Sequence, residues 1–334
     1  MLNLQIILTL GVISCNSMQH HPFSDLALFP QKSKNHCVCH SVLHRGQHQQ
    51  NEGDLWDCKT IHLVYLVVRF WVLYSRMSSF LRPRVALTRS NRRIGADFPV
   101  LPGKVSATQK VPAHIDRPEY AENGRPHNAP YNQVFLYHGN ERMLMRDSAK
   151  LAREMLEFSI ALVKPGISTD EIDARTFEEI VRRGAYPRPV NYSGFPKAIC
   201  TSVNEVTCHG TPDDREILEG DVVSIDVSLF KNGFHGDNCM TVIAGEGDAD
   251  ACHLVQTAED ALMQSIEMCV PGGCLSNVGT KIQEVAHAEN YGIVHEFCGH
   301  GLGAILHMYP LVKHFKNSEA LELREGMIFT VEPI

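Results

Sequence analysis

Residues 220–237 read GDVVSIDVSLFKNGFHGD, and their pattern is that of two strands joined by a tight turn. Apolar and polar residues alternate on both sides of Asn232-Gly233, the dipeptide that most strongly signals a two-residue type I′ turn between antiparallel strands. With this turn at the tip, Lys231 pairs with Phe234. The sequence therefore predicts a β-hairpin.

Two aspartates fall on one face of this predicted hairpin. Its register sets Ser228 opposite Asp237, and Asp226 shares the face of Ser228 because side chains alternate along a strand. Asp226 and Asp237 are then diagonal neighbours, about 7–8 Å apart at the backbone. In a half-buried sheet two carboxylates repel unless a positive group joins them, and a divalent cation is the simplest such group. The alternative is an exposed hairpin with two solvated acids, and the pair alone does not decide between them.

Further candidate metal ligands follow in the sequence. His300 stands between glycines, and Glu332 ends an apolar strand that Pro333 stops. Two aspartates, a histidine and a glutamate suit Mn²⁺, Fe²⁺, Co²⁺ or Zn²⁺ better than a structural zinc site, which prefers thiolates. His209, just before the hairpin, and His307 are further candidates. Any one of these histidines alone is more often structural, but their order together predicts a metal site.

The sequence around these positions resembles the type I methionine aminopeptidases, within the pita-bread metallopeptidases. The motifs that carry the resemblance are NYSGFPK at 191–197, TSVNEV at 201–206 leading to CHG at 208–210, IDV at 225–227, FHGD at 234–237, GHGLG at 299–303 and FTVEP at 329–333. The resemblance implies an α+β pita-bread fold over 141–334. In this fold two pseudo-two-fold halves form an antiparallel curved sheet covered by two helix pairs.

The resemblance also implies roles for individual residues. Two divalent ions (Co²⁺, Mn²⁺, Fe²⁺ or Zn²⁺) would be held by Asp226, Asp237, His300 and Glu332. The resemblance implies that His209 and His307 contact substrate, and the expected catalytic residues are His209, His307 and Glu332. A neutral imidazole at His209 or His307 could steady the oxyanion, and Glu332 could relay a proton to the leaving amine if its pKa is raised. Tyr192, Phe195 and Cys200 match the apolar wall around a methionine side chain. The implied reaction is hydrolytic removal of N-terminal methionine from nascent or imported proteins.

Two departures from the family pattern leave alternatives open. The family's fifth ligand, a glutamate on a later strand, has no counterpart before Ile334, so we expect a C-terminally truncated chain that holds its second ion poorly. Leu306 stands where the family usually has an aromatic residue. One alternative is a relative that cleaves beside proline, which the neighbourhood of His209 disfavours. The other is a non-catalytic pita-bread scaffold or an inactive truncated form, which the four intact ligands disfavour.

A faint internal repeat supports two similar halves. A helix is predicted over about 143–163, a Pro-Gly pair breaks it, and Ser168 opens a second helix with a capping box. About 106 residues later the pattern returns, with a helix over about 250–269, another Pro-Gly break and a helix from Ser276. Each helix pair precedes strands that carry candidate ligands, so both halves are expected to contribute to one site.

Composition fits a globular enzyme of this kind. The 334 residues are 44% hydrophobic and 21% charged, and the net charge of −7 argues against nucleic-acid binding. The 11 cysteines follow no spacing rule, so no disulfide framework is expected and a reducing compartment is favoured. The apolar run 62–74 is short and contains Arg69, so no integral membrane span is predicted. We expect a monomer that binds peptides or nascent proteins with N-terminal methionine.

The N-terminal region differs from the rest of the chain. Residues 1–76 show no clear periodicity and are interpreted as a doubtful or disordered upstream extension. From Met77 to Asp97 the sequence is rich in arginine and serine and has no acidic residue before Asp97, a composition typical of an organellar transit peptide. Residues 77–140 are therefore expected to be a transit peptide and an extended linker. The expected location is the mitochondrion, with plastid or cytoplasm as the alternatives.

Overall fold

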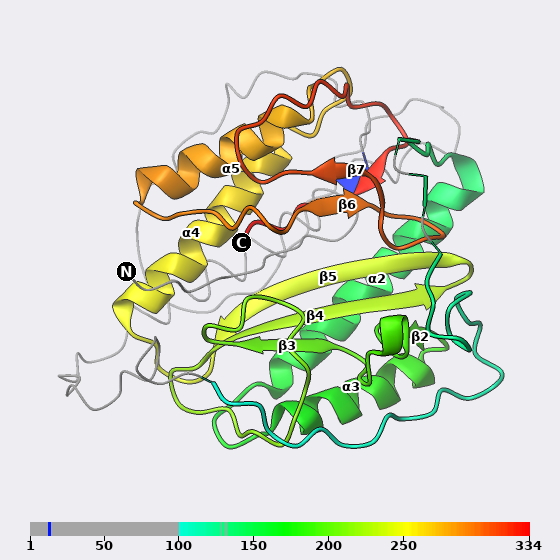
Figure 1. Cartoon of the computed structure of the whole chain (residues 1–334), viewed down its shortest axis with the longest axis vertical. Coiled ribbons are helices and arrows are strands. Elements are labelled where there is room, and N and C mark those ends of the chain that lie inside the picture. Colours follow the sequence, from blue (N-terminus) through cyan, green and yellow to red (C-terminus); the bar gives the residue numbers. More distant parts are fainter. Residues whose placement is uncertain (1–12, 15–99, 128, 131) are drawn as a thin grey trace, which may run out of the picture. The chain divides into compact units, whose positions relative to one another are not determined.

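The computed structural model describes residues 13–14, 100–127, 129–130 and 132–334, in two successive groups of helices and strands (Figure 1). The first group comprises α2 (Gly139–Leu162), α3 (Thr169–Arg182), β2 (Tyr186–Pro187), the 3-10 helix η2 (Tyr192–Gly194), β3 (Cys200–Val203), β4 (Val222–Lys231) and β5 (Phe234–Ile243). The second comprises α4 (Ala249–Ile266), α5 (Ser276–Ala288), β6 (Gly299–Gly301), β7 (Met308–Val312) and β8 (Ile328–Phe329). Apart from β1 (Ile13–Ser14), the expectations for 1–76 and for the basic stretch after it lie outside the described residues.

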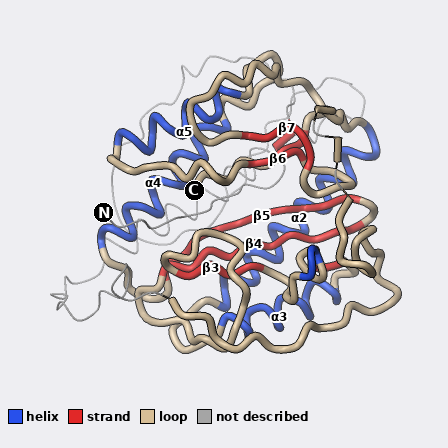
Figure 2. Tube along the Cα trace, viewed as in Figure 1, coloured by secondary structure: helices blue, strands red, loops and turns tan. Residues whose placement is uncertain are grey.

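The two predicted helix pairs are confirmed, with shifted ends. Helix α2 begins at Gly139, four positions before the apolar periodicity of its sequence starts, and α4 ends at Ile266, before its predicted end. Ser168 caps α3 as predicted, because its side-chain oxygen accepts a hydrogen bond of 3.1 Å from the Glu171 backbone N–H. The helices are coloured blue in Figure 2, which shows α2 and α3 with the first strands and α4 and α5 with the later ones.

The described strands pair antiparallel and fall into two sheets. In the first sheet β5 pairs along the whole of β4, while β2 and β3 pair with successive parts of the other edge of β4. The second sheet has the order β1-β8-β6-β7. The α+β class with antiparallel strands and two helix pairs is therefore confirmed.

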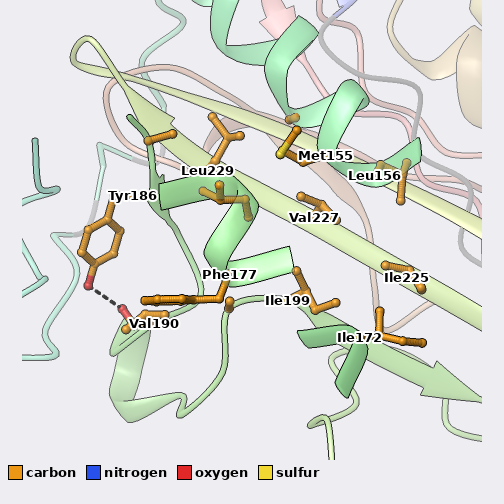
Figure 3. Packing of buried hydrophobic residues seen from close by; sticks show 14 of the residues in the cluster. Met155, Leu156, Ile172, Phe177, Tyr186, Val190, Ile199, Ile225, Val227 and Leu229 are labelled. Carbon is orange, nitrogen blue, oxygen red and sulfur yellow. Dashed lines mark hydrogen bonds between the residues drawn. The ribbon is translucent and has the colours of Figure 1, made fainter. Parts of the chain in front are cut away.

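Strand β4 is buried on both faces, and its two faces differ in chemistry. Val223, Ile225, Val227 and Leu229 join the hydrophobic core that α2 and α3 supply, and Figure 3 shows this packing. On the same side Phe177 of α3 lies near Tyr186, whose hydroxyl donates a 3.0 Å hydrogen bond to the Val190 carbonyl. The opposite face of β4 carries Ser224, Asp226 and Ser228. This polar face is the one that holds the candidate ligands.

A second hydrophobic core belongs to the second half. Its buried members include Leu262 of α4, Val278 and Ile282 of α5, and Phe329 of β8. Each half therefore has its own helix pair packed on its own strands, as the internal repeat predicts.

Backbone pairings confirm the repeat at the level of single residues. Isolated bridges join Ser168 to Glu216 in the first half and Cys274 to Glu322 in the second, and both partners are displaced by 106 positions. The hydrogen bond from Gly166 N–H to the Ile217 carbonyl, 2.8 Å long, has a counterpart of 2.8 Å from Gly272 to Leu323 at the same displacement. The Pro-Gly breaks are thus equivalent structural positions.

The described residues between 100 and 138 form no regular helix or strand, as the proline-rich sequence predicts. They are nevertheless packed on the first half: Val111, Ile115 and Ala121 join its core. The Tyr120 hydroxyl donates a 2.6 Å hydrogen bond to the carbonyl of Arg188. No helix in the described part of the chain has the length and apolarity needed to cross a membrane.

Candidate active site

The hairpin at residues 222–243 has the register that the sequence predicted. Lys231 pairs with Phe234 and Ser228 with Asp237. Asn232 and Gly233 have φ values of 52° and 85°, as a type I′ turn requires. Asp226 lies opposite Cys239, so Asp226 and Asp237 are diagonal neighbours on one face.

The two aspartates are enclosed, which excludes the alternative of an exposed hairpin. The Asp237 side chain is 14% exposed, and the Asp226 Oδ1 atom is buried with no hydrogen-bond partner. Burial, and then the neighbouring Asp237 carboxylate, raise the pKa of Asp226 well above its usual range. A buried carboxylate oxygen with no hydrogen-bond partner, next to a second carboxylate, is the arrangement expected of residues that bind a cation.

His300 on β6 and Glu332 add a third and a fourth candidate ligand to this face. Its Nε2 atom lies 3.6 Å from Asp237 Oδ2 and 3.6 Å from Glu332 Oε1. Its Nδ1 atom lies 3.1 Å from the Gly301 carbonyl, which can only accept, so Nδ1 carries the proton. Burial lowers the pKa of His300, so the imidazole is neutral and its bare Nε2 lone pair points at two carboxylates. Three mutually repelling acceptors converge here.

Two further residues orient these groups. Thr330 Oγ1 donates a 2.7 Å hydrogen bond to Glu332 Oε1 and accepts one of 2.9 Å from the His300 backbone N–H. His314 Nε2 accepts from the backbone N–H groups of Gly299, at 3.2 Å, and Glu332, at 3.1 Å. Both residues therefore join the strand that carries His300 to the segment that carries Glu332.

The structure places the histidines assigned to substrate differently. The ring centroid of His307 is 4.4 Å from that of His300, and its Nδ1 atom is 2.9 Å from the Tyr192 hydroxyl. His209, which like His307 is exposed, lies edge-on to Phe297, with ring centroids 6.0 Å apart. His307 thus borders the candidate ligands directly, whereas His209 stands at the rim.

The three residues assigned to the apolar wall come from one short segment. Tyr192 begins η2 and Phe195 follows its end, so the two are held by the same turn. Cys200 on β3 is buried and lies opposite Asp226 of β4. Burial raises the pKa of the Cys200 thiol well above its usual range, so it is an uncharged wall residue and no thiolate.

Sequence reasoning missed three residues of this site. Arg188 is 8% exposed and its guanidinium carbon lies 3.5 Å from the centroid of the Tyr192 ring. An arginine between two prolines in an apolar stretch was an available signal for it. His314 and Thr330 gave no such signal, because their roles depend on backbone groups that only the folded chain brings near them.

The donor set fits divalent ions in its chemistry. Asp226, Asp237 and Glu332 offer carboxylate oxygens and His300 offers a neutral imidazole nitrogen, the ligand types of Mn²⁺, Fe²⁺, Co²⁺ and Zn²⁺. Among the residues described, no group of three or more His, Cys, Asp or Glu side chains has the geometry of a formed metal site. The fit rests on the orphaned Asp226 oxygen and on the bare His300 nitrogen facing two carboxylates.

Comparisons with known proteins agree with this arrangement. Residues 143–334 match the sequence profile of metallopeptidase family M24. The chain is 43% identical over 233 residues to the mitochondrial methionine aminopeptidase 1D of Dictyostelium discoideum, covering 70% of this chain and 58% of that protein. It is 41% identical over 234 residues to the chloroplastic/mitochondrial methionine aminopeptidase 1D of Arabidopsis thaliana, covering 70% and 66%.

A solved methionine aminopeptidase from Rickettsia prowazekii matches the structure with a TM-score of 0.59 and 38% sequence identity, covering 60% of this chain and 82% of that one. This match confirms the pita-bread fold that the resemblance implied. The chain spans 58% and 66% of the lengths of the Dictyostelium and Arabidopsis relatives.

Proposed function

Because this chain belongs to metallopeptidase family M24, we propose that it removes the N-terminal methionine from peptides and nascent or imported proteins. Two divalent ions, among Co²⁺, Mn²⁺, Fe²⁺ and Zn²⁺, would be held by Asp226, Asp237, His300 and Glu332. The names of the similar proteins from Dictyostelium and Arabidopsis support this activity and this substrate class.

One observation carries the proposal. His300 Nε2, which bears no proton, faces Asp237 Oδ2 and Glu332 Oε1 at 3.6 Å each. Three acceptors at such distances repel one another in a half-buried site, and a bound cation would remove that repulsion. When bound, two divalent ions supply the Lewis acidity that activates a water molecule and polarises the scissile carbonyl.

The residues around the ligands would act on the substrate. The Tyr192 hydroxyl holds the His307 ring by its Nδ1 atom, so the other ring nitrogen is free to meet the oxyanion that forms on the scissile carbonyl. His209 would contact the substrate from the rim. Glu332 would relay a proton to the leaving amine.

The first side chain of the substrate would lie against Tyr192, Phe195 and Cys200. These residues give an aromatic and thiol wall, which suits a thioether side chain. The requirement for a free N-terminus would come from the carboxylates at the site, which favour an amine over an acylated nitrogen.

The test is an assay on purified protein with Met-Ala-Ser in the presence of Mn²⁺ or Co²⁺, followed by release of free methionine. Release from Met-Ala-Ser but not from its N-acetylated form is expected, and chelation of the ions should abolish it. Asp237→Asn should remove the activity, whereas Asp250→Asn, at an exposed acid of α4, should leave it unchanged. A folded protein that binds no ion and cleaves no peptide would instead be a scaffold.

We also propose an organellar location, the mitochondrion in particular. The two similar proteins carry mitochondrial and chloroplastic/mitochondrial names, and the arginine-rich stretch after Met77 has the composition of a transit peptide. Residues 77–140 fused to a fluorescent protein should enter the organelle. A version with glutamine at Arg82, Arg84, Arg89, Arg92 and Arg93 should stay in the cytosol, and diffuse fluorescence from the unchanged fusion would contradict the proposal.

A further inference from the structure

We propose that Arg188 forms a subsite for a neutral oxygen acceptor at the end of the substrate's first side chain, such as the sulfoxide oxygen of an N-terminal methionine sulfoxide. This inference rests on the proposed function, because it assigns the first side chain to the wall at Tyr192 and Cys200. It concerns a residue that neither binds the ions nor belongs to the wall predicted from the sequence.

Strand register puts Arg188 on the face that holds the candidate ligands. Pro187 pairs with Leu229, and the Arg188 backbone N–H donates a 3.0 Å hydrogen bond to the Ser228 carbonyl. Ser228 in turn lies opposite Asp237. Cross-strand neighbours share a face, so Arg188, Ser228 and Asp237 form a row across β4, with adjacent strands about 4.8 Å apart.

The guanidinium group is held in place but lacks partners for its hydrogens. It stacks on Tyr192, with 3.5 Å between Arg188 Cζ and the ring centroid. The Arg188 carbonyl accepts from the Tyr120 hydroxyl at 2.6 Å, which fixes the backbone. The Nε and Nη2 atoms are buried with no hydrogen-bond partner. Burying the N–H donors of a charged group without acceptors costs free energy, so a bound acceptor would stabilise the Arg188 guanidinium.

Arg188 also lies beside a residue of the candidate site. Tyr192, on which the guanidinium stacks, contacts His307, whose Nδ1 atom lies 2.9 Å from the Tyr192 hydroxyl.

Size and charge select the ligand. Arg188 is only 8% exposed and its unpaired Nε and Nη2 atoms are buried, so these donors suit a small acceptor group. A neutral oxygen accepts hydrogen bonds from these donors without adding a charge to the site. The thioether sulfur of methionine is a weak hydrogen-bond acceptor. Oxidation to the sulfoxide attaches a polar oxygen, a stronger acceptor, to the same sulfur atom.

The experiment compares peptides that differ only in this oxygen. For wild type, Arg188→Met and Arg188→Lys, kcat/KM is measured with Met-Ala-Ser, with its methionine sulfoxide form and with Glu-Ala-Ser, in Mn²⁺. The ratio of sulfoxide to methionine should fall about tenfold or more in Arg188→Met, the size of a lost charge-assisted hydrogen bond. Arg188→Lys should also lower it, because an ammonium lacks the planar fork. The wild type should disfavour Glu-Ala-Ser.

Arg182→Met is the matched control, because Arg182 lies at the exposed end of α3 with its side chain 68% exposed and paired with Glu179. It should leave the ratio unchanged. Binding of methionine sulfoxide amide by calorimetry separates the two proposals: Arg188-dependent binding without any cleavage would contradict the proposed function alone. Circular dichroism checks that each variant is folded. A ratio unchanged in a folded Arg188→Met or Arg188→Lys, or a preference for Glu-Ala-Ser, would overturn the subsite.

Discussion

Asp226 and Glu332 occupy equivalent positions in the two halves, 106 positions apart. Asp226 lies four residues after the first residue of β4, and Glu332 lies four residues after the first residue of β8. The strand of each half follows a glycine with positive φ, Gly220 at 83° and Gly326 at 87°. The two acids therefore reach one site from opposite halves. After burial and Asp237, Asp226 also contributes to the raised pKa of Glu332. The repeat is what brings these acids, distant in sequence, to one site.

Asp237→Asn should weaken divalent-ion binding, because Asp237 lies between Asp226 and His300 and touches both. We expect a loss of Mn²⁺ affinity of at least about tenfold in isothermal titration calorimetry. Asp250→Asn, which changes an exposed acid in the first turn of α4, serves as the control. Equal affinity in the two variants would show that the hairpin pair does not bind the ion.

Asp221→Asn should act on stability rather than on ion binding. Asp221 is 1% exposed, and its carboxylate accepts hydrogen bonds of 2.9 Å each from Arg215 Nη2 and Asn204 Nδ2. Loss of the charge leaves Arg215 without its counter-ion, which should lower the free energy of unfolding by about 3 kcal/mol.

Urea denaturation with chelator present measures this change. Glu325→Gln is the control, because its ion pair with Arg142 is at the surface, the Glu325 side chain being 54% exposed. That substitution should change the unfolding free energy by less than about 0.5 kcal/mol. Similar effects of both substitutions would refute the assignment of Asp221 as a buried structural ion-pair member.

Gly236→Ala should disrupt the packing of α2 on β5. A Cβ at this glycine would lie 2.2 Å from the Ser148 carbonyl oxygen, a backbone atom of α2 that is unable to move without shifting the helix. The expected loss of stability is about 2 kcal/mol or more. Gly292→Ala is the matched control, since nothing lies within 4 Å of its added Cβ. Equal melting temperatures of the two variants would show that the helix yields easily.

His314→Gln should reduce the acid sensitivity of the fold. Burial lowers the pKa of His314 to about 3, and its Nε2 accepts two backbone N–H groups that a proton would displace. Below about pH 6.5 the unfolded chain binds a proton at this position that the folded chain does not, so stability falls as pH falls towards 3.

Each pH unit in that window costs about 1.4 kcal/mol for one such histidine. In His314→Gln, the amide oxygen of the new side chain can still accept a hydrogen bond but does not titrate. The unfolding free energy of the variant, measured in urea at pH 6, 5 and 4, should therefore decline less steeply than that of the wild type by about this amount per unit. Parallel declines would mean that His314 titrates normally in the fold.

Local rules were enough for the hairpin and the helix pairs. Asn232-Gly233 set the register because a two-residue turn with positive φ leaves a single way to pair the flanking strands. Ser168 and the Pro-Gly breaks fixed the ends of helices for the same reason, since caps and breakers act on neighbouring residues. The resemblance then supplied roles for His300 and Glu332 that local rules alone left open.

The environment of the site depended on contacts between distant segments. Arg188 was passed over because its stack on Tyr192 and its lack of acceptors arise only when β2 pairs with β4. His314 was passed over because its role is to accept backbone N–H groups from two strands, and no pattern of side chains signals that.

The amino-acid sequence was sufficient to name the candidate ligands and to predict the turn that pairs Asp226 with Asp237. Turn chemistry and strand alternation are local, so they depend on neighbouring residues alone. Three features came from long-range packing: the enclosure of those acids, the position of the His300 nitrogen facing Asp237 and Glu332, and the buried guanidinium along the same face. The burial of a group and the charges around it depend on atoms from many distant segments, so neither can be read from neighbouring residues.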